Sequence, residues 1–92
     1  MAAIRMSREH SKDYDQAKAS VETIVVNLAE EFGVKYHWED ETVRFKGSGA
    51  KGYMTVLPDR LELKLELGFM LLPFKSRIER EMHEYLDEFC SG

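Results

Sequence analysis

The chain has 92 residues, of which 43% are hydrophobic and 33% are charged, and its net charge is −4. This length provides for one hydrophobic core, so we expect a single α+β domain over residues 1–92. The negative charge argues against attraction of the whole surface to nucleic acid or anionic membranes. The single cysteine excludes an internal disulfide, and no apolar run approaches the roughly 20 residues that a bilayer requires. Because the start lacks a secretory signal, we expect a cytoplasmic protein.

A short strand and a long amphipathic helix are predicted for the first third of the chain. Residues 3–8 alternate between apolar and polar side chains, which is typical of a strand. Asp13 followed by Gln16 has the spacing of a capping box, which starts a helix. The helix carries an apolar stripe with a 3.6-residue repeat, at Ala17, Val21, Ile24, Val25, Leu28, Ala29 and Phe32. Gly33 stands where a left-handed glycine ends a helix.

Four further strands are predicted, each with alternating apolar and polar residues. They lie at about residues 34–39, 43–46, 53–57 and 61–67. The last of them has leucine at every second position, which marks one buried face. The links between them are short enough for hairpins, so the four strands should form an antiparallel meander.

A second amphipathic helix is predicted from about Pro73 to Phe89, because proline suits a first helical turn. The order is therefore strand, helix, four strands, helix. Both helices need an apolar face to cover, and the sheet offers one. We expect a two-layer α+β fold with a mainly antiparallel sheet and both helices on one face. It would be a reduced version of the helix-grip arrangement, in which a curved sheet holds a long C-terminal helix.

The residues also form a pattern that resembles a known bacterial family. The pattern comprises Ile4, His10, Ala17, Trp38, Thr42 to Phe45, Gly49, Gly52, Leu67 to Leu72 and Phe74 to Glu79. It resembles the polyhydroxyalkanoic acid system proteins, also called granule-region proteins, over nearly the whole chain. The resemblance implies an association with the system that makes and stores polyhydroxyalkanoate granules. It brings no catalytic residues with it.

One turn departs from the family's pattern. After Trp38 and Glu39 the family tends to have Gly-Asp, whereas this chain has Asp40-Glu41. Glycine supplies the positive φ of a tight hairpin turn, and aspartate tolerates it less well. The type of turn is therefore open, although a hairpin is still expected.

No catalytic, cofactor or metal motif is evident, so we do not expect an enzyme. The three histidines lie on different predicted elements without metal-ligand spacing. No phosphate loop, nucleophile motif or dinucleotide fingerprint is present. Two interpretations of His10 remain open: a polar residue that satisfies backbone groups in its corner, or a ligand-binding or acid-base group at the sheet edge.

The candidate binding site is the apolar run between the leucine strand and the second helix. Its apolar residues are Phe69, Met70, Leu71, Leu72 and Phe74, and Lys75 and Arg77 would orient its rim. Either the run plugs the core, or it is exposed and contacts a partner. That partner would be the polyhydroxyalkanoate granule surface, a granule-system protein, or a second copy of the chain in a homodimer.

Two alternative functions use other surfaces. A small hydrophobic ligand could lie between the sheet and the second helix, in a pocket formed by His10, Trp38, Phe45, Met54 and Leu63, although a filled core is favoured. The outer face of the sheet should carry six basic residues, three acidic residues and Tyr53. A basic sheet with aromatic residues can bind single-stranded nucleic acid, but one aromatic residue argues for a solvated face with paired charges.

Overall fold

The computed structural model describes residues 2–47 and 49–91. Ser48, inside the link between the strands predicted at 43–46 and 53–57, and the side chain of Cys90 lie outside the described part. The elements are β1 (Ala2–Glu9), α1 (Tyr14–Phe32), β2 (Lys35–Glu39), β3 (Thr42–Gly47), β4 (Ala50–Val56), β5 (Arg60–Leu67), the 3-10 helix η1 (Phe69–Phe74) and α2 (Lys75–Ser91). The α+β class and the predicted order of strands and long helices are confirmed.

The five strands form one antiparallel sheet in the order β1-β5-β4-β3-β2. The four-strand meander follows the chain, and β1 then pairs with the free edge of β5. Ile4 lies opposite Leu65 in this pair, and both side chains are buried. The first strand thus extends the apolar face that the leucines of β5 begin.

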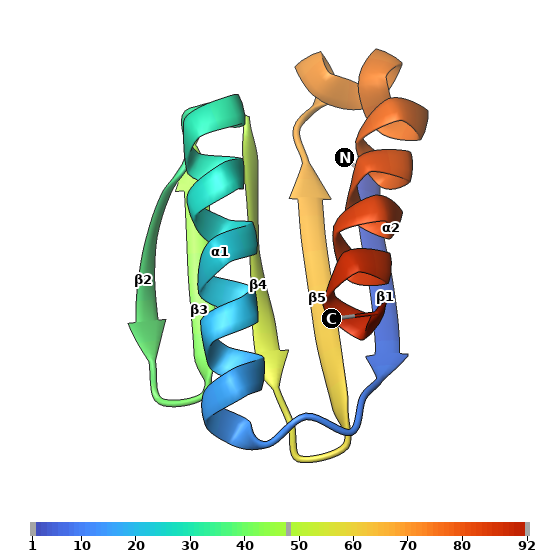
Figure 1. The fold of residues 1–92 in the computed structure, drawn as a ribbon. Helices are drawn as coiled ribbons and strands as arrows, with labels where there is room; N and C mark the ends of the chain where they lie inside the picture. Colours follow the sequence, from blue (N-terminus) through green and yellow to red (C-terminus); the bar gives the residue numbers. More distant parts are fainter. Residues whose placement is uncertain (1, 48, 92) are drawn as a thin grey trace.

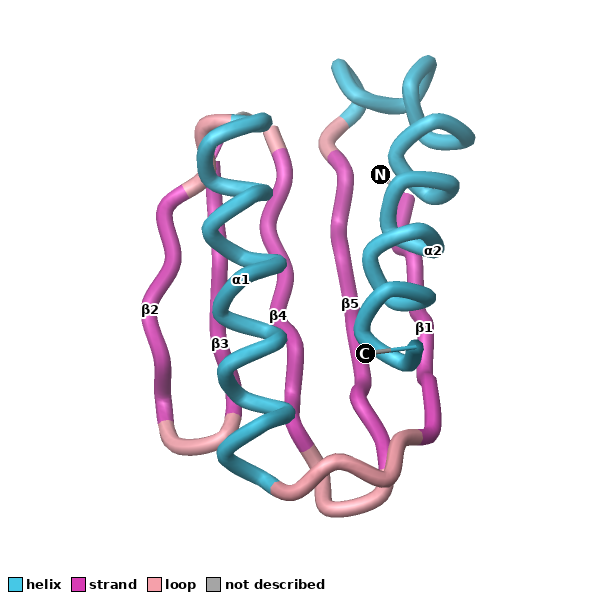
Figure 2. The backbone as a smooth tube through the Cα atoms, viewed as in Figure 1, coloured by secondary structure: helices cyan, strands magenta, loops and turns pink. Residues whose placement is uncertain are grey.

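Both α-helices lie on the same face of the sheet (Figure 1). In Figure 2, α1 lies over β3 and β4, and α2 lies over β1 and β5. The core between the layers consists of aliphatic residues of both helices and inward residues of the strands. Its largest fully buried side chains are Met54, Leu61, Leu67, Leu86, Val21, Val25, Val43 and Val56. The second layer therefore covers the sheet with two separate helices.

The ends of α1 follow the predicted capping residues. Asp13 is the N-cap, and its Oδ1 accepts a hydrogen bond of 2.8 Å from the backbone N–H of Gln16. Gly33 has φ 71° and ψ 24°, and its N–H donates to the carbonyl of Ala29. This left-handed residue ends the helix without the steric penalty that a Cβ would bring.

β2 and β3 form a hairpin although the turn between them contains no glycine. Asp40 adopts φ 55°, a left-handed conformation that aspartate reaches more easily than most residues. Trp38 pairs with Val43 across the hairpin, and Glu39 pairs with Thr42. The expected hairpin is confirmed, and the left-handed residue in it is an aspartate.

The connection from β5 to α2 is longer than the sequence pattern predicts. The chain first forms η1, and the α-helix begins at Lys75, not Pro73. Pro73 has no N–H to donate to the carbonyl of Phe69, so an α-helix cannot continue regularly through this position. A segment with i to i+3 turns fits this sequence, and the α-helix starts directly after it.

Candidate functional site: an apolar surface beside a cavity

Four large apolar side chains are exposed on η1. Phe69 is 76% exposed, Met70 73%, Leu72 39% and Phe74 51%. We call these four residues the 69–74 surface. The η1 segment that carries it lies beyond the end of β5, at the start of α2 (Figure 1). Apolar side chains that are contiguous and exposed are typical of a contact region.

Leu71 lies in the same segment but has a different environment. It is partly buried, packs against the core and is close to Gly49. Its N–H donates to the carbonyl of Gly68 (3.0 Å), and the N–H of Gly68 donates to the carbonyl of Gly49 (2.8 Å). Leu71 therefore anchors η1 to the turn between β3 and β4, while its neighbours in the segment remain exposed.

The two basic residues at the rim are paired with acidic residues one helical turn away. Lys75 Nζ lies 3.2 Å from Glu79 Oε2, and Arg77 Nε lies 3.6 Å from Glu81 Oε1. Such pairs on a helix surface contribute only a few tenths of a kcal/mol. They leave the rim close to neutral, which suits contact with an apolar surface.

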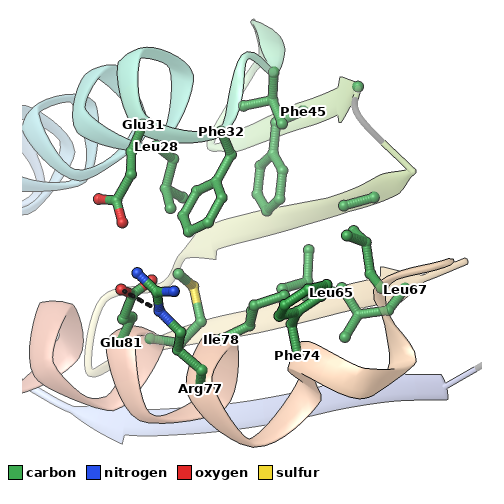
Figure 3. A pocket seen from close by; sticks show the side chains of 15 residues that line it. Leu28, Glu31, Phe32, Phe45, Leu65, Leu67, Phe74, Arg77, Ile78 and Glu81 are labelled. Atoms are coloured by element: carbon green, nitrogen blue, oxygen red, sulfur yellow. Dashed lines mark ion pairs between the residues drawn. The ribbon is translucent and has the colours of Figure 1, made fainter.

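A cavity of about 300 Å³ adjoins the 69–74 surface. It lies between α1, α2 and the end of the sheet at which β5 leads into η1 (Figure 3). Its lining comprises Leu28, Glu31, Phe32, Val34, Phe45, Gly47, Ala50, Leu65, Leu67, Leu71, Phe74, Arg77, Ile78, Glu81 and Met82. Phe74 and Leu71 belong both to this lining and to η1. The exposed surface and the cavity therefore form one continuous apolar region.

Three charged side chains face each other from the two helices at the cavity. Figure 3 shows Glu31 of α1 opposite Arg77 and Glu81 of α2. Glu31 Oε2 accepts a hydrogen bond of 2.9 Å from the Tyr85 hydroxyl. Burial, followed by this hydrogen bond and by nearby carboxylates, raises the pKa of Tyr85 to about 12. Within the described part of the chain, the buried Glu81 Oε2 has no hydrogen-bond partner.

The pocket residues expected from the sequence occupy several environments. Phe45 lines the cavity. Met54 and Leu63 are buried in the packed core. Trp38 lies partly buried against α1, where its Nε1–H donates to Glu22 Oε1 at 3.3 Å. The cavity is thus at one end of the sheet, and the large side chains at the centre fill the space between the layers.

His10 lies in the corner between β1 and α1. Its Nε2 donates to the carbonyl of Leu57 (2.9 Å), and its Nδ1 accepts from the backbone N–H of Lys12 (3.1 Å). Both contacts fit the neutral tautomer with hydrogen on Nε2. The imidazole also meets the ring of Phe89 edge-on, with centroids 5.4 Å apart. These contacts favour the backbone-satisfying interpretation of His10.

The outer face of the sheet carries basic residues that are partly paired. Lys51 Nζ and Lys64 Nζ lie 3.6 and 3.4 Å from the Glu66 carboxylate. Arg44 lies over the ring of Tyr53, 5.8 Å from its centroid. Hydrogen bonds and charges from lysines 64 and 51 lower the pKa of Glu66. The predicted solvated face with cross-strand charge pairs agrees with this geometry.

Glu31 and Glu81 are site residues that sequence reasoning missed. Glu81 is the i,i+4 partner of Arg77 on α2, and its side chain is only 22% exposed. The signal that could have identified it is its position one turn after Ile78, which is buried. No comparable signal marks Glu31, because its role depends on where α2 lies relative to α1.

Two general features of the site also bear on function. Among the described residues, no group of three or more His, Cys, Asp or Glu side chains is arranged to hold a metal ion. No helix in the described ranges combines the length and apolar character needed to cross a membrane.

Comparison with known proteins identifies the family. Neither a curated protein nor a solved structure matches the chain. A protein-family model matches residues 4–89, and its description reads "Putative polyhydroxyalkanoic acid system protein". The match covers both layers of the fold, the 69–74 surface and the cavity. The chain therefore belongs to the polyhydroxyalkanoic acid system protein family.

Proposed function

We propose that this protein is a non-enzymatic accessory protein of polyhydroxyalkanoate metabolism that binds the polyester surface of storage granules in the cytoplasm. The observation that carries the proposal is the exposure of the 69–74 surface at one end of the domain. The family description supports the choice of polyester as the contact. A polyester surface presents alkyl groups and ester carbonyls, and an apolar surface with a nearly neutral rim fits it.

The exposed area is sufficient for a weak to moderate contact. Phe69 and Met70 are each about three-quarters exposed, which corresponds to roughly 150 Å² for each side chain. Complete burial of both would contribute about 7 kcal/mol before the entropy cost of association. Contact with a flat surface covers about half of each side chain, so their share falls to roughly 3 kcal/mol, which is about 100-fold in affinity.

The test is co-sedimentation with polyhydroxyalkanoate particles that carry no other protein. The double variant Phe69→Ser, Met70→Ser should adsorb about 100-fold more weakly than the wild type. These two residues project from η1 and are not part of the cavity lining, so the fold and the cavity should be retained. Tyr14→Ser is the matched control, since Tyr14 is a large exposed side chain (44%) on a different element, α1.

Two results would overturn the proposal. Particles that fail to capture the wild type would exclude the polyester surface as the partner. Equal capture of the double variant and the wild type would exclude the 69–74 surface as the contact. Analytical ultracentrifugation of the same proteins tests whether the partner is a second copy of the chain. If the wild type is a dimer and the double variant is a monomer, this surface would be assigned to self-association instead.

A further inference from the structure

The cavity beside the 69–74 surface combines an apolar interior with one unsatisfied acceptor. Most of its lining is aliphatic or aromatic, including Phe45, Leu65 and Met82. Glu81 Oε2 is buried at the cavity and lacks a donor within the described residues. A buried carboxylate oxygen without a donor is costly. This oxygen is closed to water, so a hydroxyl of a molecule in the cavity reaches it once the surrounding side chains shift, and the molecule then gains a charge-assisted hydrogen bond.

The size of the cavity indicates a short acyl chain. Its volume of about 300 Å³ is at the lower end of small-molecule sites. A water molecule takes a share of about 30 Å³ in the liquid, and a methylene group is of similar size, so the cavity has room for a chain of up to about ten carbons. Longer chains would have to extend toward the 69–74 surface.

The charges at the cavity disfavour an anionic ligand. Glu31 and Glu81 contribute two negative charges and Arg77 contributes one positive charge, so their sum is −1. The same carboxylates help to raise the pKa of Tyr85, which shows that negative charge is disfavoured here. The Arg77 side chain is 69% exposed and has N–H groups beyond the one that faces Glu81. These N–H groups can donate to a neutral carbonyl.

We propose that the cavity binds the hydroxyl-terminal end of a medium-chain hydroxyalkanoate ester. The alkyl group lies among the apolar side chains, the hydroxyl donates to Glu81 Oε2, and the Arg77 guanidinium donates to the ester carbonyl. Such a group is the chemical end of a polyester chain, so the ligand class rests on the proposed function. The cavity would hold a chain end while the 69–74 surface contacts the bulk polymer.

Isothermal titration calorimetry with three soluble probes tests the ligand class on the wild type. The probes are methyl 3-hydroxyoctanoate, methyl octanoate without the hydroxyl, and the free 3-hydroxyoctanoate anion. The hydroxy ester should bind at least about tenfold more tightly than either of the others, because only it satisfies Glu81 without adding a negative charge. No binding of the hydroxy ester, or an affinity for it no higher than for either of the other two probes, would overturn the proposal.

Two variants locate the site. Ala50→Phe adds a ring at the cavity wall and should abolish binding of the hydroxy ester. Ala3→Phe makes the same change on the outer face of the sheet and should leave the affinity unchanged, as Ala3 is exposed. Glu81→Leu replaces the carboxylate with an apolar side chain, so the hydroxy ester and methyl octanoate should then bind with about equal affinity. A preference that survives Glu81→Leu would contradict the assigned role of this carboxylate.

The two proposals can fail separately. A wild type that adsorbs to particles but binds no soluble hydroxy ester would exclude the cavity site and leave the surface contact in place. A wild type that binds the ester but not the particles would exclude the surface contact alone. When both proposals hold, the Ala50→Phe protein should adsorb to particles as the wild type does and should no longer bind the ester.

Discussion

Gly52 is the residue at which a single added carbon should be most damaging. It lies in β4 between two inward-facing partners, Phe45 on β3 and Leu65 on β5. The Cβ of an alanine here would overlap the carbonyl oxygen of Lys64 and lie 3.0 Å from Leu65 Cα. Because these neighbours are backbone atoms, they cannot rotate away, and β4 and β5 would have to separate locally.

The cost of that separation can be estimated from its parts. Forcing extra volume into a packed region costs about 1–3 kcal/mol. Weakening two neighbouring backbone hydrogen bonds adds about 1 kcal/mol each. The sum for Gly52→Ala is about 3–5 kcal/mol. A chain of 92 residues has a total stability of roughly 5–14 kcal/mol, so this substitution should remove about a fifth of it or more.

Urea unfolding followed by the fluorescence of Trp38, the only tryptophan, measures the loss. Gly68→Ala is the matched control, since its Cβ would approach only the Gly49 carbonyl, at 3.1 Å from the oxygen, and should cost less than about 1 kcal/mol. A Gly52→Ala protein that loses less than about 1 kcal/mol, or no more than the control, would refute the reasoning.

Three further predictions concern a turn, an ionisation and the outer face. Asp40→Gly should stabilise the protein by about 0.5–1 kcal/mol, seen as a rise in Tm, because glycine relieves the left-handed backbone; a fall in Tm would contradict this. Tyr85, with its pKa raised from 10.0 to about 12, should contribute stability that is complete below pH 10 and is lost as the pH rises through 12. Tyr85→Phe should remove this pH dependence from the free energy of unfolding. If the free energy of unfolding changes with pH in the same way in the variant, Tyr85 is not its source. We expect no salt-sensitive binding of single-stranded DNA in fluorescence anisotropy at low salt. If the wild type binds and the double variant Lys46→Glu, Lys51→Glu does not, the outer face is a nucleic-acid surface instead.

Most of the fold could be predicted because local patterns and tertiary packing agree. The leucines of β5 all face the core, and the capping residues Asp13 and Gly33 bound α1 as expected. The pairing of β1 could not be predicted, because the long connection through α1 does not fix where the strand returns. The structure shows β1 on the edge of β5 that the meander leaves open.

The site could be predicted only in part. The apolar run was visible in the sequence, but the difference between Leu71 and its neighbours depends on the turn geometry of η1. The position of the cavity depends on side-chain volume. Met54 and Leu63 fill the middle of the space between the sheet and the helices, whereas small residues, Gly47 and Ala50, line its end. Sequence alternation gives the face of each residue and does not give the space that remains between the layers.

The hydrogen bonds that join Gly68, Gly49 and Leu71 have a kinetic consequence. They fix the backbone beneath Phe69 and Met70 before any partner arrives. Encounter with a granule would then need no slow folding step, and little main-chain freedom would be lost on arrival. Differences in affinity among variants should therefore appear mainly in how long the protein stays attached, and much less in how quickly it attaches.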